Sequence, residues 1–218
     1  MSKFQYLIEN DFVIETNRLR IYPFKLNMKI IRDLYEIYSS RSNTKDFCTP
    51  HLNGFMPFAE YFRDKFFRFQ KNEKCVLIML IKSKQENKAI GVRNVIFDNW
   101  YDDIIGYEDG YYTSYQKIAF NRRQNVISEI VINEKYWNSG YAFEASEAIF
   151  KKLKESDIEN VLTFISESNN ISKLLDEKLG FKEISEEELF DKYGYLEESL
   201  NHTDNPKSKL LYLLELQK

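Results

Sequence analysis

The stretch Tyr136-Trp137-Asn138-Ser139-Gly140-Tyr141-Ala142-Phe143-Glu144-Ala145 decides how this chain is interpreted. It holds one of only seven glycines in 218 residues, where a helix is predicted to begin. The first amides of a helix lack partners inside it, and the helix dipole adds positive charge, so the position attracts anions. Small residues at Gly140 and Ala142 leave the approach open, which predicts a site for a phosphate-bearing ligand. The alternative is that Gly140 only relieves a tight turn.

The segments around this stretch predict a strand, a helix and a second strand in succession. Residues 126–132 (VISEIVI) are typical of a strand, and residues 140–155 place apolar side chains on one helical face. Residues 161–165 form an almost continuous apolar run, which indicates a strand buried on both sides. We therefore expect a βαβ unit with parallel strands. It is not a P-loop, because no Lys-Ser/Thr pair follows Gly140, and the three glycines of the dinucleotide fingerprint are missing.

The remaining segments continue the alternation of strands and helices. Three helices are predicted: one capped by Asn27, one with Pro57 in its first turn, and one from Asn169 to a left-handed stop at Gly180. Strands are predicted at 75–82, 88–97 and 209–216. No linker, repeat or low-complexity segment interrupts them. The sequence therefore predicts one α/β domain over residues 1–218.

Composition excludes several classes of function. The net charge of −3 and the pI near 5.6 lack the basic surplus of a nucleic-acid binder. The longest apolar run, residues 75–81, is far shorter than the roughly 20 residues of a membrane helix, and the first residues show no signal-peptide core. Cys48 and Cys75 form no spaced set, and His51 and His202 have no ligand cluster nearby. We expect a soluble cytoplasmic protein without a structural metal.

Four segments carry a resemblance to a known family. Residues 130–145 (IVINEKYWNSGYAFEA) resemble the acetyl-coenzyme A signature of the GNAT superfamily of N-acetyltransferases, in the branch of the ribosomal-protein N-α-acetyltransferases. Residues 169–181 (NNISKLLDEKLGF) are similar to the second signature of that branch. Residues 15–24 resemble its opening strand, and residues 89–92 its third motif. The ordered matches imply the GNAT fold, an α/β fold whose mixed sheet of about seven strands is flanked by helices.

The resemblance also implies where acetyl-CoA would bind. Backbone amides from Asn138 to Ala142 would hold the pyrophosphate, and strand residues 130–132 would pair with the pantetheine arm and polarise the thioester carbonyl. Asn169 and Ser172 would contact the thiol end. The cofactor residues so implied are Ile130, Val131, Ile132, Trp137, Asn138, Ser139, Gly140, Tyr141, Ala142, Asn169 and Ser172. The chain departs from the family at Asn138-Ser139, where relatives carry Gly followed by Lys, Arg or Gln.

The implied reaction is transfer of an acetyl group to a primary amine by direct attack on the thioester. Glu129 interrupts an apolar strand just before the cofactor loop and is the candidate base, directly or through water. Alternatively it pairs with a neighbouring cation, and many relatives carry their glutamate earlier, near Ile127. Ser172 would protonate the leaving thiolate or only cap its helix. Asp176 stands where many relatives place a tyrosine acid.

The sequence does not identify the amine that accepts the acetyl group, which can be a protein N-terminus, a polyamine or a small-molecule amine. Residues 98–115 are rich in acids and aromatics, which suits a cationic amine or a solvated hairpin. We expect no metal, no nucleic acid and no membrane among the partners, and a homodimer stays open. Two other function classes remain: a catalytically silent acyl-CoA-binding protein, and an aromatic-rich interaction protein that shares only the architecture.

Overall fold

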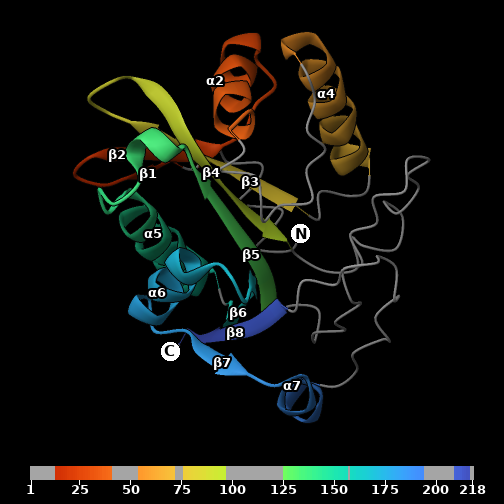
Figure 1. Cartoon of the computed structure of the whole chain (residues 1–218), viewed down its shortest axis with the longest axis vertical. Helices are drawn as coiled ribbons and strands as arrows, with labels where there is room; N and C mark the ends of the chain where they lie inside the picture. The colour runs from red at the N-terminus through yellow and green to blue at the C-terminus, as the bar shows by residue number, and fades with distance from the viewer. Residues whose placement is uncertain are drawn as a thin grey trace. The chain divides into compact units, whose positions relative to one another are not determined.

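The computed structural model describes residues 13–40, 54–71, 76–96, 125–156, 158–193 and 209–216. These residues fall into two compact units, which are described separately (Figure 1). The first draws on Met1–Val95 and Glu129–Lys152, and the second on Ile96–Ser128 and Leu153–Lys218. Strand β5 (Asn125–Ile132) contributes its end to the first unit and its beginning to the second.

The first unit is built on a sheet of five strands. Its hydrogen-bonded order is β1 (Ile14–Glu15), β2 (Leu19–Pro23), β3 (Val76–Ser83), β4 (Lys88–Ile96) and the end of β5. Strand β2 pairs antiparallel with both β1 and β3. The polar turn between β3 and β4 places Asn87 at a φ of 54°, a left-handed conformation that Asn tolerates better than most residues. The buried side chains of β2, β3 and β4 form most of this core.

Three helices pack on this sheet. In α2 (Met28–Tyr38), the Asn27 side chain accepts a hydrogen bond from the Lys29 amide at 2.8 Å, which confirms the predicted cap. Helix α4 (Phe55–Lys71) has Pro57 in its first turn and lies beside α2, where the Tyr35 and Phe58 rings are 5.4 Å apart (Figure 1). Helix α5 (Tyr141–Glu155) contacts β4 through Arg93, which donates to the Ser146 hydroxyl at 2.5 Å.

Strand β4 approaches the end of β5 closely at Gly91. A Cβ atom at this position would lie 2.6 Å from the carbonyl oxygen of Val131 and even closer to the side chain of Ile132. Beyond it, the Asn133 amide donates to the Ile90 carbonyl at 2.8 Å. A glycine is therefore required here because a neighbouring backbone occupies the space of its side chain.

The second unit contains the beginning of β5, β6 (Asn160–Ser166), α6 (Asn170–Lys178), β7 (Lys182–Ile184), α7 (Glu186–Tyr193) and β8 (Lys209–Glu215). Its strand order is β5-β6-β8-β7. The parallel pairing of β5 with β6 runs from Asn125 with Asn160 to Ile127 with Leu162. The buried side chains of the first pair share a hydrogen bond of 2.6 Å, which holds the register. The predicted strand–helix–strand unit with parallel strands is confirmed.

Helix α6 ends as its sequence predicts. Gly180 adopts a φ of 91°, and its amide donates to the Glu177 carbonyl at 3.0 Å. The Phe181 amide donates to the Asp176 carbonyl at 2.9 Å, which completes a Schellman stop, and the Phe181 side chain is buried.

The mixed α/β fold is confirmed, with eight strands in the described residues rather than the expected seven or so. The sequence did not reveal β1 and β7, which have two and three residues, because a hydrophobic period cannot show over so short a length. It also missed α7. No helix among the described residues is long and apolar enough to cross a membrane. The single domain stays a prediction, and the acidic segment 98–115 lies outside the described residues.

Because the space beside Gly91 is filled, we expect Gly91→Ala to destabilise the protein by about 1–3 kcal/mol, the usual cost of overpacking. Urea unfolding would measure the change. The second substitution Ile132→Val removes the Ile132 methyl group that crowds the new Cβ atom, so it should restore part of the lost stability. The recovery should be incomplete because the Val131 carbonyl still occupies the same space. A Gly91→Ala protein as stable as wild type would contradict the close approach.

Candidate active site at the start of helix α5

The loop between β5 and α5 (residues 133–140) is held firmly at its beginning. Buried Asn133 accepts a hydrogen bond from the Lys135 amide at 3.1 Å, which opens the short 3-10 helix η2 (Glu134–Tyr136). The Trp137 indole donates to the Ile132 carbonyl at 2.7 Å. The strand end and the loop are therefore joined by side-chain bonds that leave the later loop amides uninvolved.

Tyr136 ties the same loop to the turn between β3 and β4. Its hydroxyl donates to Glu86 at 2.6 Å, and its ring meets the Tyr141 ring edge-on at 6.1 Å. Burial, followed by the hydrogen bond to Glu86, raises the pKa of Tyr136 to about 12. The phenol thus stays protonated and keeps donating at physiological pH.

The end of the loop adopts an unusual backbone conformation. Asn138 and Gly140 have φ values of 58° and 77°, both in the left-handed region. A Cβ atom at Gly140 would meet only the Arg18 guanidinium, at an ordinary 3.5 Å, so conformation rather than crowding selects glycine here. Gly140 therefore serves the tight turn through its positive φ, and this conformation is compatible with a ligand site.

The first backbone amides of α5 have no hydrogen-bond partner inside the helix. The first helical bond runs from the Glu144 amide to the Gly140 carbonyl at 3.0 Å, so the amides of the preceding residues have no acceptor within the helix. Asn138, Ser139 and Gly140 are exposed, and Tyr141 and Ala142 are half-buried. This arrangement of exposed amides at a positive helix end suits a phosphate group.

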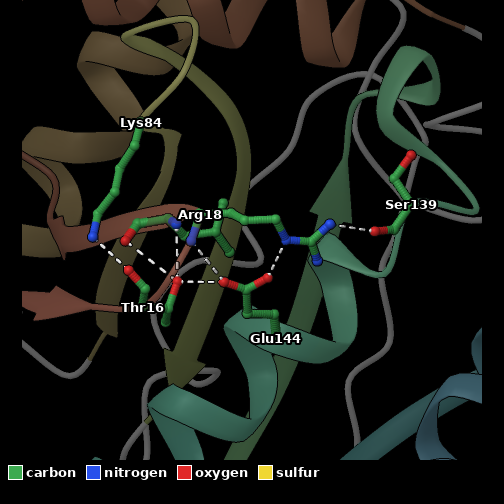
Figure 2. Close-up of polar contacts among 6 residues, drawn as sticks. Thr16, Arg18, Lys84, Ser139 and Glu144 are labelled. Atoms are coloured by element: carbon green, nitrogen blue, oxygen red, sulfur yellow. Dashed lines mark hydrogen bonds and ion pairs between the residues drawn. The ribbon is translucent and has the colours of Figure 1, made fainter.

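A network that the sequence analysis missed surrounds this helix start (Figure 2). Arg18 donates from Nε to Glu144 at 2.6 Å and from Nη1 to the Ser139 carbonyl at 2.8 Å, and its guanidinium lies 4.3 Å from the Tyr141 ring centre. The Thr16 hydroxyl and the Arg18 amide donate to the other Glu144 oxygen at 2.5 and 3.1 Å. The available signal was an arginine in the opening strand and a glutamate in the first turn of the helix, but their distance along the chain hid the pairing.

This network affects the ionisation of Glu144. Burial opposes the charged form, but hydrogen bonds from Thr16 and Arg18, together with the charge of Arg18, outweigh it and hold the pKa of Glu144 below 4.5. The carboxylate is therefore ionised whenever the protein is near neutral pH.

Glu129 lies half-buried on β5, in the first unit with the loop. Burial raises the pKa of Tyr38 on α2. The charge of Glu129 and, after it, the phenol of Tyr61 on α4 raise this pKa further. Glu129 is thus close enough to Tyr38 for its charge to act on that phenol. The strand places the candidate base near the two aromatic helices.

The predicted site residues of the second unit lie at the start of α6. The Asn169 side chain accepts from the Ser172 amide at 3.2 Å, so the structure assigns the helix cap to Asn169 rather than to the Ser172 hydroxyl. Ser172 is half-buried. Asp176 is buried and accepts a hydrogen bond from Thr163 at 2.6 Å, which fastens α6 to β6.

Comparison with known proteins identifies the family. The sequence matches the acetyltransferase (GNAT) domain family over residues 18–182. The chain belongs to this GNAT family. Membership supports acyl transfer to amines in general, and it favours an N-acetyltransferase over an interaction protein that shares only the architecture. A comparison with curated proteins finds no match.

Solved GNAT structures share the fold. A GNAT acetyltransferase from Bacillus anthracis is 18% identical and covers 94% of this chain and 98% of its own, with a TM-score of 0.62. A candidate ribosomal-protein-serine acetyltransferase from Vibrio cholerae is 13% identical, and the match covers 94% of this chain and 98% of that one, with a TM-score of 0.61. Spermidine N-acetyltransferase from Vibrio cholerae, in complex with CoA and spermine, is 12% identical, and the match covers 92% of this chain and 96% of that one, with a TM-score of 0.59. At such identities the likeness shows the fold alone.

In this GNAT protein, the structure gathers the predicted site residues from Glu129 to Ala142 in the first unit, and it places Asn169 and Ser172 in the second. Within the described parts of the chain, no group of three or more His, Cys, Asp or Glu side chains is arranged to hold a metal ion. The predicted roles of these residues in binding and catalysis stay predictions.

The lowered pKa of Glu144 predicts a pH-dependent contribution to stability. A carboxylate whose pKa is lower in the folded state stabilises the protein above pH 4.5, and this stabilisation is lost as the pH falls through the folded value. We expect Glu144→Gln to lower the Tm at pH 7 by about 2–4 °C, which corresponds to about 1 kcal/mol. The difference from wild type should shrink below pH 4.5.

The matched control is Glu147→Gln on the exposed side of the same helix, which should change the Tm little at either pH. A Glu144→Gln effect of equal size at pH 7 and pH 3.5 would show that the charge of Glu144 is not what stabilises the helix start.

Proposed function

We propose that this protein transfers an acetyl group from acetyl-CoA to a primary amine. The observation that carries the proposal is the exposed, left-handed loop end at Asn138 and Gly140, which presents amides at the start of α5 in a chain of the GNAT family. The amides and the helix dipole supply the complement to a diphosphate without a basic side chain at Asn138 or Ser139.

The other cofactor contacts follow from the same strand and loop. Ile130, Val131 and Ile132 follow the last residue pair of the parallel ladder, Ile127 with Leu162, and this position supports pairing of their backbone with the pantetheine arm. Trp137 anchors the loop to the Ile132 carbonyl. In the proposed complex, Ser139, Tyr141 and Ala142 complete the diphosphate contacts, and Asn169 and Ser172 contact the thiol end.

The proposed chemistry needs one proton acceptor and one proton donor. An alkyl ammonium, with a pKa of about 10.4, must lose a proton before its nitrogen can attack the thioester carbon. Glu129 accepts that proton, directly or through water. As the carbon–sulfur bond breaks, Ser172 gives its hydroxyl proton to the thiolate, and the second proton of the attacking nitrogen passes to the Ser172 oxygen, directly or through water. The products are the N-acetylated amine and free CoA.

The surroundings of Glu129 support a cationic substrate. Beyond its burial, the charge of Glu129 and the phenol of Tyr61 both raise the pKa of Tyr38, so these three side chains lie near one another. A carboxylate with neighbouring aromatic rings can hold an ammonium group by charge and by cation–π contact. A polyamine, a protein N-terminus and a small amine all present such a group, and the related spermidine N-acetyltransferase was solved with spermine.

Release of free thiol from acetyl-CoA tests the proposal. The full chain is incubated with acetyl-CoA and separate amines: spermidine, spermine, peptides with a free N-terminus and small amino compounds. We expect thiol release above the hydrolysis background with at least one amine, together with its acetylated product by mass spectrometry. Tight CoA binding with no turnover of any amine would instead indicate a silent acyl-CoA-binding protein.

Substitution of Gly140 tests the loop as the diphosphate site. Asn tolerates the left-handed conformation of this residue but adds a side chain beside the exposed amides. We expect Gly140→Asn to remain folded and to raise the Kd for CoA by about tenfold or more, measured by calorimetry, because the added side chain keeps the phosphate out of place at the amides.

The matched control is Gly180→Asn, which makes the same substitution at another left-handed glycine, the stop of α6. It should lose similar stability and bind CoA as wild type does. Equal CoA affinity for Gly140→Asn and wild type would place the diphosphate elsewhere.

Substitution of Glu129 tests the base. Glu129→Gln should lower kcat at pH 7 by about 10²- to 10⁴-fold, the usual contribution of a positioned base. Activity should recover in part near pH 10, where the amine is already deprotonated. The exposed Glu134→Gln loses the same charge close to the loop and should leave kcat unchanged. A Glu129→Gln profile that matches wild type at every pH would remove Glu129 from the mechanism.

A further inference from the structure

Arg18, in the bend between β1 and β2, contacts three parts of the α5 start, and Figure 2 shows its bonds to Glu144 and Ser139. It binds the Glu144 carboxylate in the first turn, the Ser139 carbonyl in the loop and the face of Tyr141 at the first helical position. We propose that Arg18 is a positioning residue that orients the Gly140 amide for the diphosphate of CoA. This inference rests on the proposed function.

The argument begins with the peptide plane between Ser139 and Gly140. In a trans peptide, the carbonyl and the following N–H are rigidly coplanar and point in opposite directions. The chain contains no cis peptide in its described residues, so this geometry applies here. By holding the Ser139 carbonyl at 2.8 Å, Arg18 therefore directs the Gly140 amide away from itself. Because Gly140 tolerates many conformations, an external contact is needed to keep one of them.

The second step concerns the charge of Glu144. A carboxylate in the first turn of a helix is itself attracted to the helix N-terminus and competes there with a bound anion. In this protein both Glu144 oxygens are engaged elsewhere, one by Thr16 and the Arg18 amide, the other by the Arg18 guanidinium. The network thus balances the negative charge beside the loop and keeps it from the amides.

Only arginine satisfies all three contacts. Its planar fork donates in two directions at once and stacks on an aromatic ring, whereas a lysine ammonium is a single compact charge. Lysine at this position could keep the ion pair with Glu144, but it could not also hold the Ser139 carbonyl and cover the Tyr141 ring. Charge alone is therefore not expected to replace Arg18.

The experiment compares acetyl-CoA with S-acetyl-pantetheine, a truncated substrate that lacks the diphosphate. For Arg18→Gln and Arg18→Lys we expect the KM for acetyl-CoA and the Kd for CoA to rise about tenfold or more, because an amide is misplaced. Values of kcat, and of kcat/KM for S-acetyl-pantetheine, should stay near wild type. The matched control is Arg20→Gln: Arg20 lies two residues further on, in β2, and its Nε pairs with the exposed Glu15 at 3.3 Å.

The outcomes separate this inference from the proposed function. If wild type binds CoA and Arg18→Gln binds it equally well, Arg18 is not a positioning residue and the proposed function stands. Equal losses with acetyl-CoA and S-acetyl-pantetheine would reveal a merely structural role and also overturn the inference. If Arg18→Gln does not fold, Arg18→Lys, which retains the charge opposite Glu144, decides by the same comparison. Wild type that neither binds CoA nor releases thiol would overturn both.

Discussion

The backbone between β5 and α5 must expose its last amides while remaining in one conformation, and the surrounding residues satisfy both requirements. Asn138 and Gly140 have left-handed φ values, and a glycine in particular is easily displaced from one conformation. The loop is therefore fixed by its own Trp137 indole, which binds the end of β5, and by Arg18, which binds the Ser139 carbonyl from outside the loop. Preorganised amides bind an anion without the free-energy cost of ordering a loop at that moment.

Two glycines in this unit serve opposite physical purposes. Gly91 exists because a neighbouring strand occupies the space of a side chain, and its backbone conformation is ordinary. Gly140 has room for a side chain but requires a positive φ. The first lets β4 and the end of β5 meet closely, and the second turns the chain into α5. Both act on the same strand-to-helix connection, which explains how a glycine-poor chain uses its few glycines.

Charge at the proposed site is balanced over a network instead of being concentrated in the loop. The loop lacks the basic residue that relatives carry after the first glycine position, and the chain as a whole has a net charge of −3. Arg18 is a cation that contacts the end of the loop, and its partner Glu144 is ionised because its hydrogen bonds hold its pKa low. Binding of an anion would then depend mainly on amides and on the helix dipole, which are fixed in place by this ion pair.

The sequence by itself determined the fold class, the parallel strand–helix–strand unit, the Asn27 cap and the Gly180 stop, because local periodicity and capping act over a few residues. It also indicated the family. Only the tertiary structure decided that Arg18 meets Glu144 and Ser139, and that Gly91 faces the end of β5. These contacts join segments far apart in the chain, and no local pattern encodes which distant atoms become neighbours when the sheet forms.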